Sequence, residues 1–307
     1  MKKVLKLIGI GLACLFGVII LAALGLYTKT RVQFNKTYDV QVELIAIPTD
    51  AESIEHGKHL AFILCAECHG EDLGGTPNWI SLPGLAVVSP PNLTSGQGSV
   101  TAEFTDEDWV RVLLHGVKPD GHSVFVMRSM DYQYLSGDDL GDILAYVKSA
   151  PPINRDDEDL EGNYHLTFLG NVAYGAGAFG NLLSATRIQD NRPSSFPQPD
   201  ATSEYGEYLV NINGCRGCHG AQLAGGKPGD PNSVLAPNLT PGGELIAWTD
   251  VDFIQTMRTG VALSGHQLNP KFMPWQYKGK MTDDELKAIF LYLQSLSKLP
   301  TSTELVK

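Results

Sequence analysis

The sequence predicts an all-α protein in which an N-terminal membrane-spanning helix precedes two small helical domains in tandem. Three observations support this prediction. An uncharged apolar run lies close to the N-terminus, the rest of the chain divides into two halves with the same order of motifs, and the apolar residues of both halves recur at helical intervals. A chain of 307 residues has room for two domains of ordinary size beside an anchor.

The N-terminal run extends over residues 7–28 and follows three lysines. At about 1.5 Å per residue, about 20 helical residues cross the roughly 30 Å core of a bilayer, so this run is long enough to span. A cleaved signal peptide is the alternative, but its apolar region is usually about 7–15 residues long, and Ala23-Leu24-Gly25 is only a passable cleavage site. The sequence favours a retained anchor at 1–30, followed by a juxtamembrane segment at 31–50.

Two copies of C-x-x-C-H, at 65–69 and 215–219, organise the two halves. In this motif two thiols form thioethers with the vinyl groups of haem, and the adjacent His becomes an axial ligand of the iron. With 5 Cys and 8 His in the chain, chance would give roughly 0.002 matches, so two matches are not accidental. The motifs predict two covalently bound haem c groups, attached through Cys65, Cys68, Cys215 and Cys218, with His69 and His219 on the iron.

Two other uses of the four cysteines are open. A thioredoxin-type C-x-x-C would need a βαβ pattern around it, and none is visible. A zinc site that pools the four thiols leaves unexplained why His follows directly both times.

A four-residue motif, Pro-Asn-Leu-Thr, recurs beyond each haem motif, at 91–94 and 237–240. Pro-Asn alone indicates a turn. Its repetition at a matched distance suggests that a backbone carbonyl here accepts the second ring N–H of the ligating His, which would fix the orientation and basicity of the imidazole. The residues assigned to this supporting role are Pro91, Asn92, Pro237 and Asn238.

Helix starts and ends repeat as well. A helix opening at 49–52 leads into the first haem motif, and one opening at 204 leads into the second. Each half then has two helices that open on Ser or Thr with an acid three residues later, and the earlier of the two should end at a glycine. These pairs are Thr105 with Asp108, Ser136 with Asp139, Thr249 with Asp252, and Thr282 with Glu285, and the glycines are Gly116 and Gly260.

The repeat places the domains at 51–153 and 204–300, with a linker at 154–203. Nearly fifty residues is long for a connector. The linker holds an acidic run at 156–159 and an apolar, Gly- and Ala-rich stretch at about 173–183. We expect it to wrap one domain, to set the angle between the two, and to place a short apolar helix at their interface.

A second axial ligand is expected on each iron, because an electron-transferring haem usually keeps both positions filled and Met opposite His raises the potential. The second half offers Met273, within Phe-Met-Pro-Trp, and Met281 is the weaker candidate. His122 and His266 are the alternative ligands. Because bis-His ligation would leave the two matched methionines without a role, we assign both histidines to loops.

The first half offers Met127 and Met130, and the repeat favours Met127. Met127 precedes Met273 by 146 positions, the same offset that relates Ser136 to Thr282, whereas Met130 precedes it by 143 and requires two opposing gaps. Arg128 replaces the Pro that follows Met273, so Met130 stays as the alternative ligand.

The two C-x-x-C-H motifs, supported by Phe-Met-Pro and Pro-Asn-Leu, resemble those of the class I cytochrome c family. The chain is most similar to membrane-anchored dihaem members, the cytochrome subunits that accompany membrane dehydrogenases or feed terminal oxidases. The resemblance covers roughly 51–153 and 204–299. It implies two class I cytochrome c domains whose first and last helices cross closely, at Gly57 with Tyr146 and at Gly206 with Tyr292. It also implies His/Met ligation by His69 with Met127 and by His219 with Met273.

The expected function is electron transfer rather than enzymatic catalysis, between partners such as a dehydrogenase, a terminal oxidase or a soluble cytochrome. A formal charge of −11 disfavours nucleic acid as a partner. Because bacteria attach haem c outside the cytoplasmic membrane, we expect a single-pass protein of that membrane whose domains face the periplasm or cell exterior. One alternative is a haem enzyme of the dihaem peroxidase kind, which needs an open iron position. Another is the cytochrome subunit of a small-molecule dehydrogenase complex, which differs in partner and not in chemistry.

Overall fold

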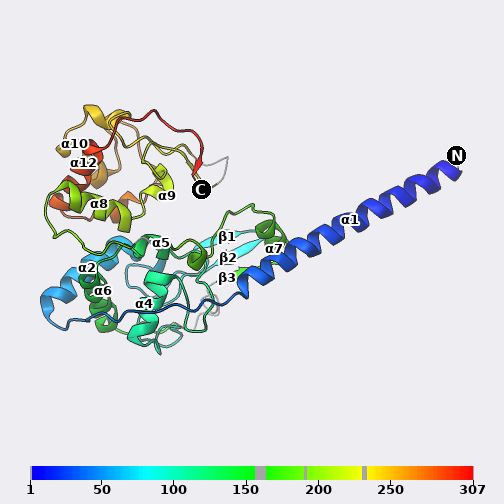
Figure 1. The fold of residues 1–307 in the computed structure, drawn as a ribbon, viewed down its shortest axis with the longest axis horizontal. Coiled ribbons are helices and arrows are strands. Elements are labelled where there is room, and N and C mark those ends of the chain that lie inside the picture. The colour runs from blue at the N-terminus through cyan, green and yellow to red at the C-terminus, as the bar shows by residue number, and fades with distance from the viewer. Residues whose placement is uncertain (1, 156–163, 190–191, 230–233, 307) are drawn as a thin grey trace.

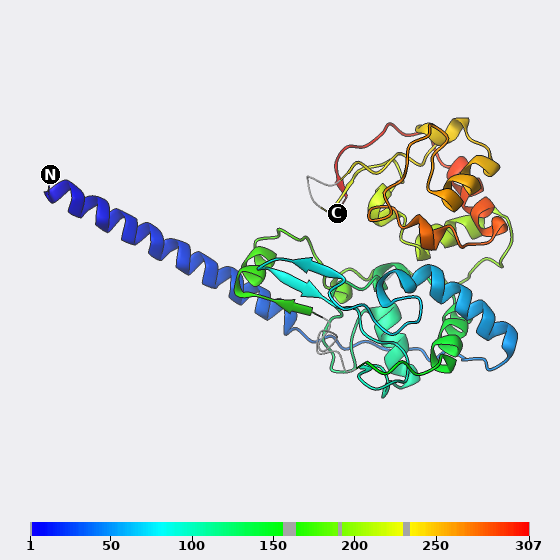
Figure 2. The same ribbon diagram turned by 180° about the vertical axis from the view of Figure 1, so that it is seen from behind.

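The computed structural model describes residues 2–155, 164–189, 192–229 and 234–306, which form one long helix and two helical domains (Figure 1). Helix α1 (Lys2–Phe34) projects away from the domains, as the view from behind also shows (Figure 2). In the described part of the chain it is the one helix long and apolar enough to cross a membrane, and none of its most apolar stretch is buried. The predicted span at 7–28 lies within it. The acidic run at 156–159 lies outside the described residues.

In the first domain the outer helices cross at a glycine. The ideal Cβ position of Gly57 lies 1.8 Å from the Asp142 carbonyl oxygen, so only glycine lets the two backbones approach this closely. The crossing packs the apolar face of the first long helix against the last, which creates the domain core. The helices of this domain are α2 (Ala51–Leu64), α3 (Ala66–His69), α4 (Asp106–His115), α5 (Ser129–Tyr132) and α6 (Gly137–Ser149).

The second domain repeats this arrangement. The ideal Cβ position of Gly206 lies 1.9 Å from the Ala288 carbonyl oxygen, which is the same close crossing of first and last helices. The domain has helices α8 (Ser203–Ile212), α9 (Arg216–His219), α10 (Asp250–Thr259), α11 (Trp275–Lys278) and α12 (Asp283–Ser295), with a 3-10 turn η3 (Glu244–Ala247) before α10.

The predicted helix caps are confirmed at four of the positions. Thr105, Ser136, Thr249 and Thr282 each accept a hydrogen bond from the backbone N–H three residues on. Gly116 and Gly260 end α4 and α10 in the left-handed conformation. The start of α2 differs from the prediction by one residue. Asp50 is the cap in place of Thr49, because its carboxylate accepts from the Ser53 N–H at 3.0 Å.

Short strands, which the sequence analysis did not predict, supplement the helices. The antiparallel sheet has the order β1 (Ile80–Leu82), β2 (Ala86–Val88), β3 (Tyr164–Leu166), so a linker strand completes a hairpin of the first domain. In the second domain β4 (Lys227–Pro228) pairs in parallel with β5 (Leu305–Val306). Strands of two or three residues are too short for an alternating apolar pattern to be visible in the sequence.

The linker wraps the first domain, but its helix does not lie at the domain interface. Ser184, in the 3-10 turn η2 (Ser184–Thr186), donates to the Met127 carbonyl at 2.5 Å, and Arg192 Nη2 donates to the Leu135 carbonyl at 2.7 Å. The linker helix α7 (Phe168–Gly175) packs on α1 instead. The prediction that this helix lies at the domain interface is therefore wrong. The aromatic cluster around Phe34, at the end of α1, gives α7 the apolar contact that we expected from the second domain.

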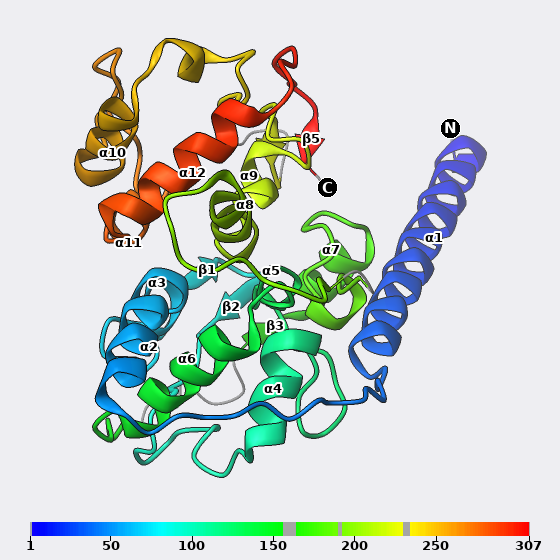
Figure 3. The ribbon, with the colours of Figure 1, turned by 60° about the vertical axis from the view of Figure 1, so that its left-hand side comes forward.

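The two domains share one continuous apolar core. In the rotated view, α11 of the second domain lies beside α2 of the first, and α8 lies beside α5 (Figure 3). The end of α2 and the end of α8 both lie at this interface, because each accepts a hydrogen bond from the other domain, and both helices lead into a C-x-x-C-H motif. The fold therefore brings the two predicted attachment segments to the boundary between the domains.

Candidate haem-binding sites

In the first domain His69 is held by a single backbone acceptor. Its Nδ1 lies 2.9 Å from the Pro91 carbonyl oxygen, and a carbonyl can only accept, so Nδ1 carries the hydrogen. The Nε2 lone pair is then free for a metal. Burial lowers the pKa of His69, while the bond to Pro91 opposes this shift, so the ring is neutral at pH 7. This is the protonation state that an iron ligand requires.

Asn92 fixes the turn that carries this acceptor. Its side chain is fully buried, and Oδ1 accepts from both the N–H of Thr94 at 2.9 Å and its hydroxyl at 2.8 Å. Nδ2 donates to the Ile153 carbonyl at 2.6 Å, which ties the turn to the end of the domain. Pro-Asn-Leu-Thr is thus a compact unit in which the Asn and Thr side chains hold the Pro carbonyl against the histidine.

The second domain reproduces this unit. His219 Nδ1 lies 2.9 Å from the Pro237 carbonyl oxygen, and burial lowers the pKa of His219 against the opposing effect of that bond. Asn238 Nδ2 donates to the Leu299 carbonyl at 2.9 Å, and Oδ1 accepts from the Thr240 N–H at 2.9 Å. His69 and His219, which are far apart in the sequence, therefore share one geometry. In each, Nδ1 donates to a Pro carbonyl and Nε2 is available to bind a metal.

A cavity of about 380 Å³ lies beside His69. Cys65, Cys68 and His69 line this cavity. Met127 also lines it, whereas Met130 does not. A flat apolar group with a central metal fits such a lining, which consists mainly of hydrophobic side chains. The apolar walls include Trp109, Leu113, Ile143, Leu144 and Val147.

The four motif cysteines are neutral thiols in this structure. Burial raises the pKa of Cys65 and Cys68 to about 12, and it also raises the pKa of Cys215 and Cys218. All four are free of disulfides. In the described part of the chain, no three His, Cys, Asp or Glu side chains converge as a metal-binding group, so the zinc interpretation gains no support.

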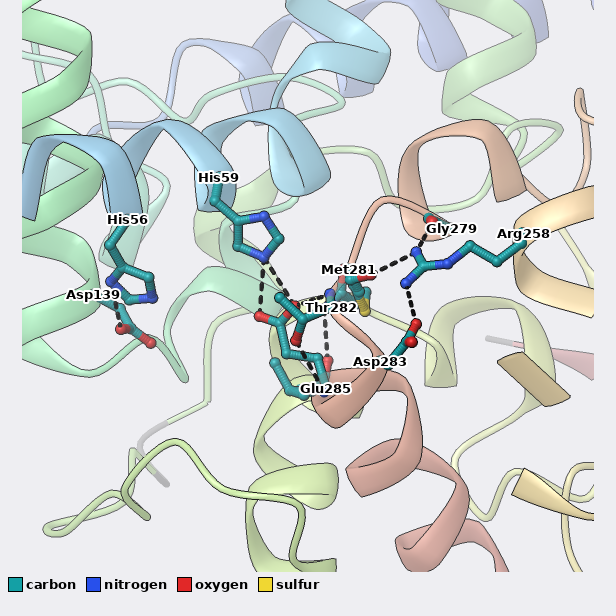
Figure 4. Close-up of polar contacts among 11 residues, drawn as sticks. His56, His59, Asp139, Arg258, Gly279, Met281, Thr282, Asp283 and Glu285 are labelled. Atoms are coloured by element: carbon teal, nitrogen blue, oxygen red, sulfur yellow. Dashed lines mark hydrogen bonds and ion pairs between the residues drawn. The ribbon is translucent and has the colours of Figure 1, made fainter. Parts of the chain in front are cut away.

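The two candidate methionines of the second domain differ in burial. Met273 is half-buried, and Met281 is 2% exposed within the core. Arg258 holds the chain here, because Nη1 donates to the Met281 carbonyl at 2.6 Å and Nη2 lies 2.6 Å from an Asp283 carboxylate oxygen (Figure 4). The Trp275 ring N–H is buried and has no protein partner among the described residues, so an acceptor on a bound group would satisfy it.

Two positively charged side chains, one from each domain, reach across the interface. Arg128, which follows Met127, pairs with Asp131 at 2.9 Å and donates through Nη2 to the Asn213 carbonyl at 2.8 Å. Lys278 of the second domain donates to the Ile63 carbonyl of the first, and burial lowers its pKa to about 8. Both acceptors lie at helix ends, where carbonyls lack partners within the helix. Each domain therefore caps the helix that leads into the haem motif of the other.

A third polar link joins the domains one turn before Ile63 in α2. His59 Nε2 lies 2.9 Å from a carboxylate oxygen of Glu285, which also accepts from the Thr282 N–H in the α12 cap (Figure 4). In the sequence, Glu285 is recognisable only as a capping residue, and no local pattern marks His59 or Lys278. Arg128 is visible there as a departure from the repeat, because it replaces the Pro that follows Met273.

The histidines assigned to loops stay away from the first cavity. His122 is half-buried beside Asp120 at 3.2 Å, and His266 is exposed. Neither lines the cavity beside His69.

Comparisons with known proteins identify the family to which the chain belongs. The family model for cytochrome c matches residues 54–151 and 203–297. The chain is 25% identical over 269 residues to the fructose dehydrogenase cytochrome subunit of Gluconobacter japonicus, covering 80% of this chain and 52% of that protein. It is 26% identical over 289 residues to the cytochrome c subunit of the quinone alcohol dehydrogenase of Gluconobacter oxydans strain 621H, covering 83% and 57%. The chain thus spans about half the length of the curated relatives it matches.

Among solved structures, a reducing HAO-like protein complex of Kuenenia stuttgartiensis is similar at 17% identity with a TM-score of 0.23, covering 82% of this chain and 99% of that one. A score this low carries no argument about the fold.

Proposed function

Because this chain belongs to the cytochrome c family, we propose that it transfers electrons through two haem c groups, one in each domain. The observation that carries the proposal is the duplicated histidine geometry, with Nδ1 of His69 and of His219 each 2.9 Å from a Pro carbonyl and Nε2 left available. Haem supplies a one-electron iron couple when it is bound. The protein holds that group, excludes water from it and sets its potential.

The roles follow from the residues at each site. Cys65 and Cys68, and likewise Cys215 and Cys218, provide the thiols for covalent attachment. His69 with Met127, and His219 with Met273, would hold the haem iron in the first and second domain. The place of Met127 in the cavity wall beside His69 supports it over Met130. If His and Met both bind each iron, no position would be left for a substrate, which supports a carrier and not a catalyst.

The interface provides a route between the domains. Cys65 follows the helix capped by Lys278, and Cys215 follows Asn213, which accepts from Arg128. The two attachment segments therefore lie at the same boundary. We infer that haems bound there would exchange electrons across this interface, and that the interdomain hydrogen bonds of Lys278 and Arg128 would hold the two segments at a constant distance.

The partners and location follow from the relatives and from α1. The relatives are cytochrome subunits of a fructose dehydrogenase and of a quinone alcohol dehydrogenase. We propose that a dehydrogenase supplies the electrons and that a terminal oxidase or a soluble cytochrome receives them. Helix α1 would anchor the chain in the bacterial cytoplasmic membrane, with both domains on the periplasmic or outer side, where haem c is attached. Confinement to the membrane surface raises the effective concentration of membrane-bound partners.

Haem counting with a redox titration tests this proposal. The purified full-length chain should give two haem c per polypeptide in a pyridine haemochrome assay, and C65S/C68S should give one. The titration should resolve two one-electron steps, and the reduced protein should bind carbon monoxide poorly at both haems. Fewer than two haems, or rapid carbon monoxide binding at either iron, would contradict the carrier assignment.

A further inference from the structure

Helix α7 crosses α1 at the end of its apolar run. Phe168, at the start of α7, stacks on Tyr27 with ring centroids 5.3 Å apart, and Gly175, at its end, accepts from Lys29 Nζ at 2.8 Å. Both ends of α7 thus contact α1 near the end of its uncharged run, and α7 lies beside this end of α1 (Figures 1 and 3). The two backbones touch, because the ideal Cβ position of Gly175 lies 2.4 Å from the Leu26 carbonyl oxygen.

This crossing has a defined depth if α1 spans a bilayer. The uncharged run of α1 ends at residue 28, and Lys29 and Arg31 follow it. Basic side chains at the end of a span lie among the lipid headgroups, and aromatic side chains such as Tyr27 favour the same zone. A helix that packs on α1 at this level therefore lies at the height of the membrane surface.

The outer side of α7 is apolar and uncovered. Phe168 is 48% exposed and Leu169 is 61% exposed. Residues 166–186 contain no Asp, Glu, Lys or Arg, although the chain as a whole has a net charge of −11. An uncharged, exposed segment is unusual on such an acidic protein. Its place beside the membrane-spanning helix indicates that lipid covers it.

Helix α7 is also fixed to the first domain. Thr167 caps it by accepting from the Gly170 N–H at 3.0 Å, and the Thr167 hydroxyl donates to the Gly84 carbonyl in the β1–β2 turn at 2.8 Å. Asn171 accepts from Thr30 of α1 through its carbonyl at 2.7 Å. The helix therefore links the sheet of the first domain to the end of α1.

We propose that α7 is a second membrane contact, in which Phe168 and Leu169 insert into the headgroup and acyl boundary of the lipid surface beside α1. This proposal rests on the proposed membrane anchor. A single spanning helix would let the first domain tilt and rotate, whereas a second contact in the membrane plane fixes the orientation of that domain. The first haem site would then face its partners at a constant height and angle.

Spin-label accessibility tests the proposal in the full-length holoprotein. In a C14S background, single cysteines at Leu169, Leu21 and Val251 would be labelled with a nitroxide after haem attachment. These positions have similar exposure, at 61%, 70% and 69%. Leu21 reports the span and Val251 reports a surface of the second domain. In vesicles of phosphatidylcholine and phosphatidylglycerol, relaxation by oxygen, which concentrates in lipid, is compared with relaxation by a water-soluble nickel complex.

We expect the spin labels at L169C and L21C to be relaxed more strongly by oxygen than by the nickel complex, and the label at V251C to be relaxed more strongly by the nickel complex. If L21C favours oxygen while L169C favours nickel, the anchor stands and the second contact is overturned. If L169C is shielded from both reagents, protein covers the helix and the lipid assignment is likewise overturned. If L21C favours nickel, the anchor and the second contact fail together.

Discussion

Arg128 Nη2 donates to the carbonyl oxygen of Asn213 at 2.8 Å, across the boundary between the two domains. Arg128 directly follows the proposed ligand Met127, and Asn213 precedes the attachment residue Cys215 by two positions. One hydrogen bond therefore connects the segment that carries the proposed ligand of the first haem to the proposed attachment segment of the second. Lys278 makes the opposite connection by donating to the Ile63 carbonyl.

Replacement of Arg128 should loosen this boundary. R128Q removes a charge-assisted hydrogen bond to Asn213 and leaves Asp131 without its cation. We expect a loss of about 1–3 kcal/mol in the free energy of unfolding, measured by urea titration. The control is R155Q, which breaks the more exposed Arg155–Asp72 pair at 3.1 Å and should change stability by less than about 0.5 kcal/mol. Equal effects of the two substitutions would argue against a special role for Arg128.

The His59–Glu285 pair should give the interface a pH optimum. The hydrogen bond to Glu285 raises the pKa of His59 above 6.5 despite burial. Burial acts to raise the pKa of Glu285, but the hydrogen bond and charge of His59, together with the hydrogen bonds from Thr282, outweigh it, and the net pKa lies below 4.5. The contribution of His59 is complete below pH 6.5 and is lost as pH rises through its folded pKa. That of Glu285 is complete above pH 4.5 and is lost as pH falls through its folded pKa.

The stability difference between the wild type and E285Q should therefore be largest between pH 4.5 and 6.5 and should shrink on either side. Glutamine keeps the α12 capping box, so the substitution isolates the ion pair. Urea midpoints measured from pH 4 to 9 give the comparison, and H59Q should show the same profile. A difference that does not vary with pH would contradict the pairing.

The crossing of α2 and α6 should not tolerate a side chain at Gly57. G57A places a methyl group against the Asp142 carbonyl and must push the helices apart, which we expect to cost about 1–3 kcal/mol. The matched control is G137A, where the nearest atom to the added Cβ is 3.9 Å away, and stability should be unchanged or slightly higher. Thermal unfolding of both holoproteins, followed by circular dichroism, distinguishes them. An unchanged melting temperature for G57A would mean that the crossing is wider than described.

Met127 and Met130 can be separated by spectroscopy. M127A should abolish the sulfur-to-iron charge-transfer band of the first haem in the oxidised protein, and it should lower the potential of that haem, because Met opposite His raises it. M130A should leave both properties unchanged, since Met130 lies outside the wall of the cavity. A C215S/C218S background, which would carry the first haem alone, keeps the two spectra apart. Loss of the band in M130A with its retention in M127A would reverse the assignment.

The sequence by itself determined the features that depend on neighbouring residues. The C-x-x-C-H spacing, the four Ser and Thr caps, the terminating glycines and the duplicated Pro-Asn-Leu-Thr unit all act within a few positions, so their residue types are sufficient to identify them. The repeat could also align Met127 with Met273, because both halves keep the same order of elements. The strands were missed because two or three residues carry no periodic pattern.

Only the tertiary structure decided where the two halves meet and where α7 lies. Lys278 and Ile63 are 215 positions apart, and no local pattern indicates that a lysine will cap a distant helix. The apolar stretch of the linker was visible in the sequence, but two surfaces could cover it, and hydrophobicity does not distinguish them. The close approach of Gly175 to Leu26 and the hydrogen bond from Thr30 select α1, because shape and backbone geometry, unlike hydrophobicity, are specific to one partner.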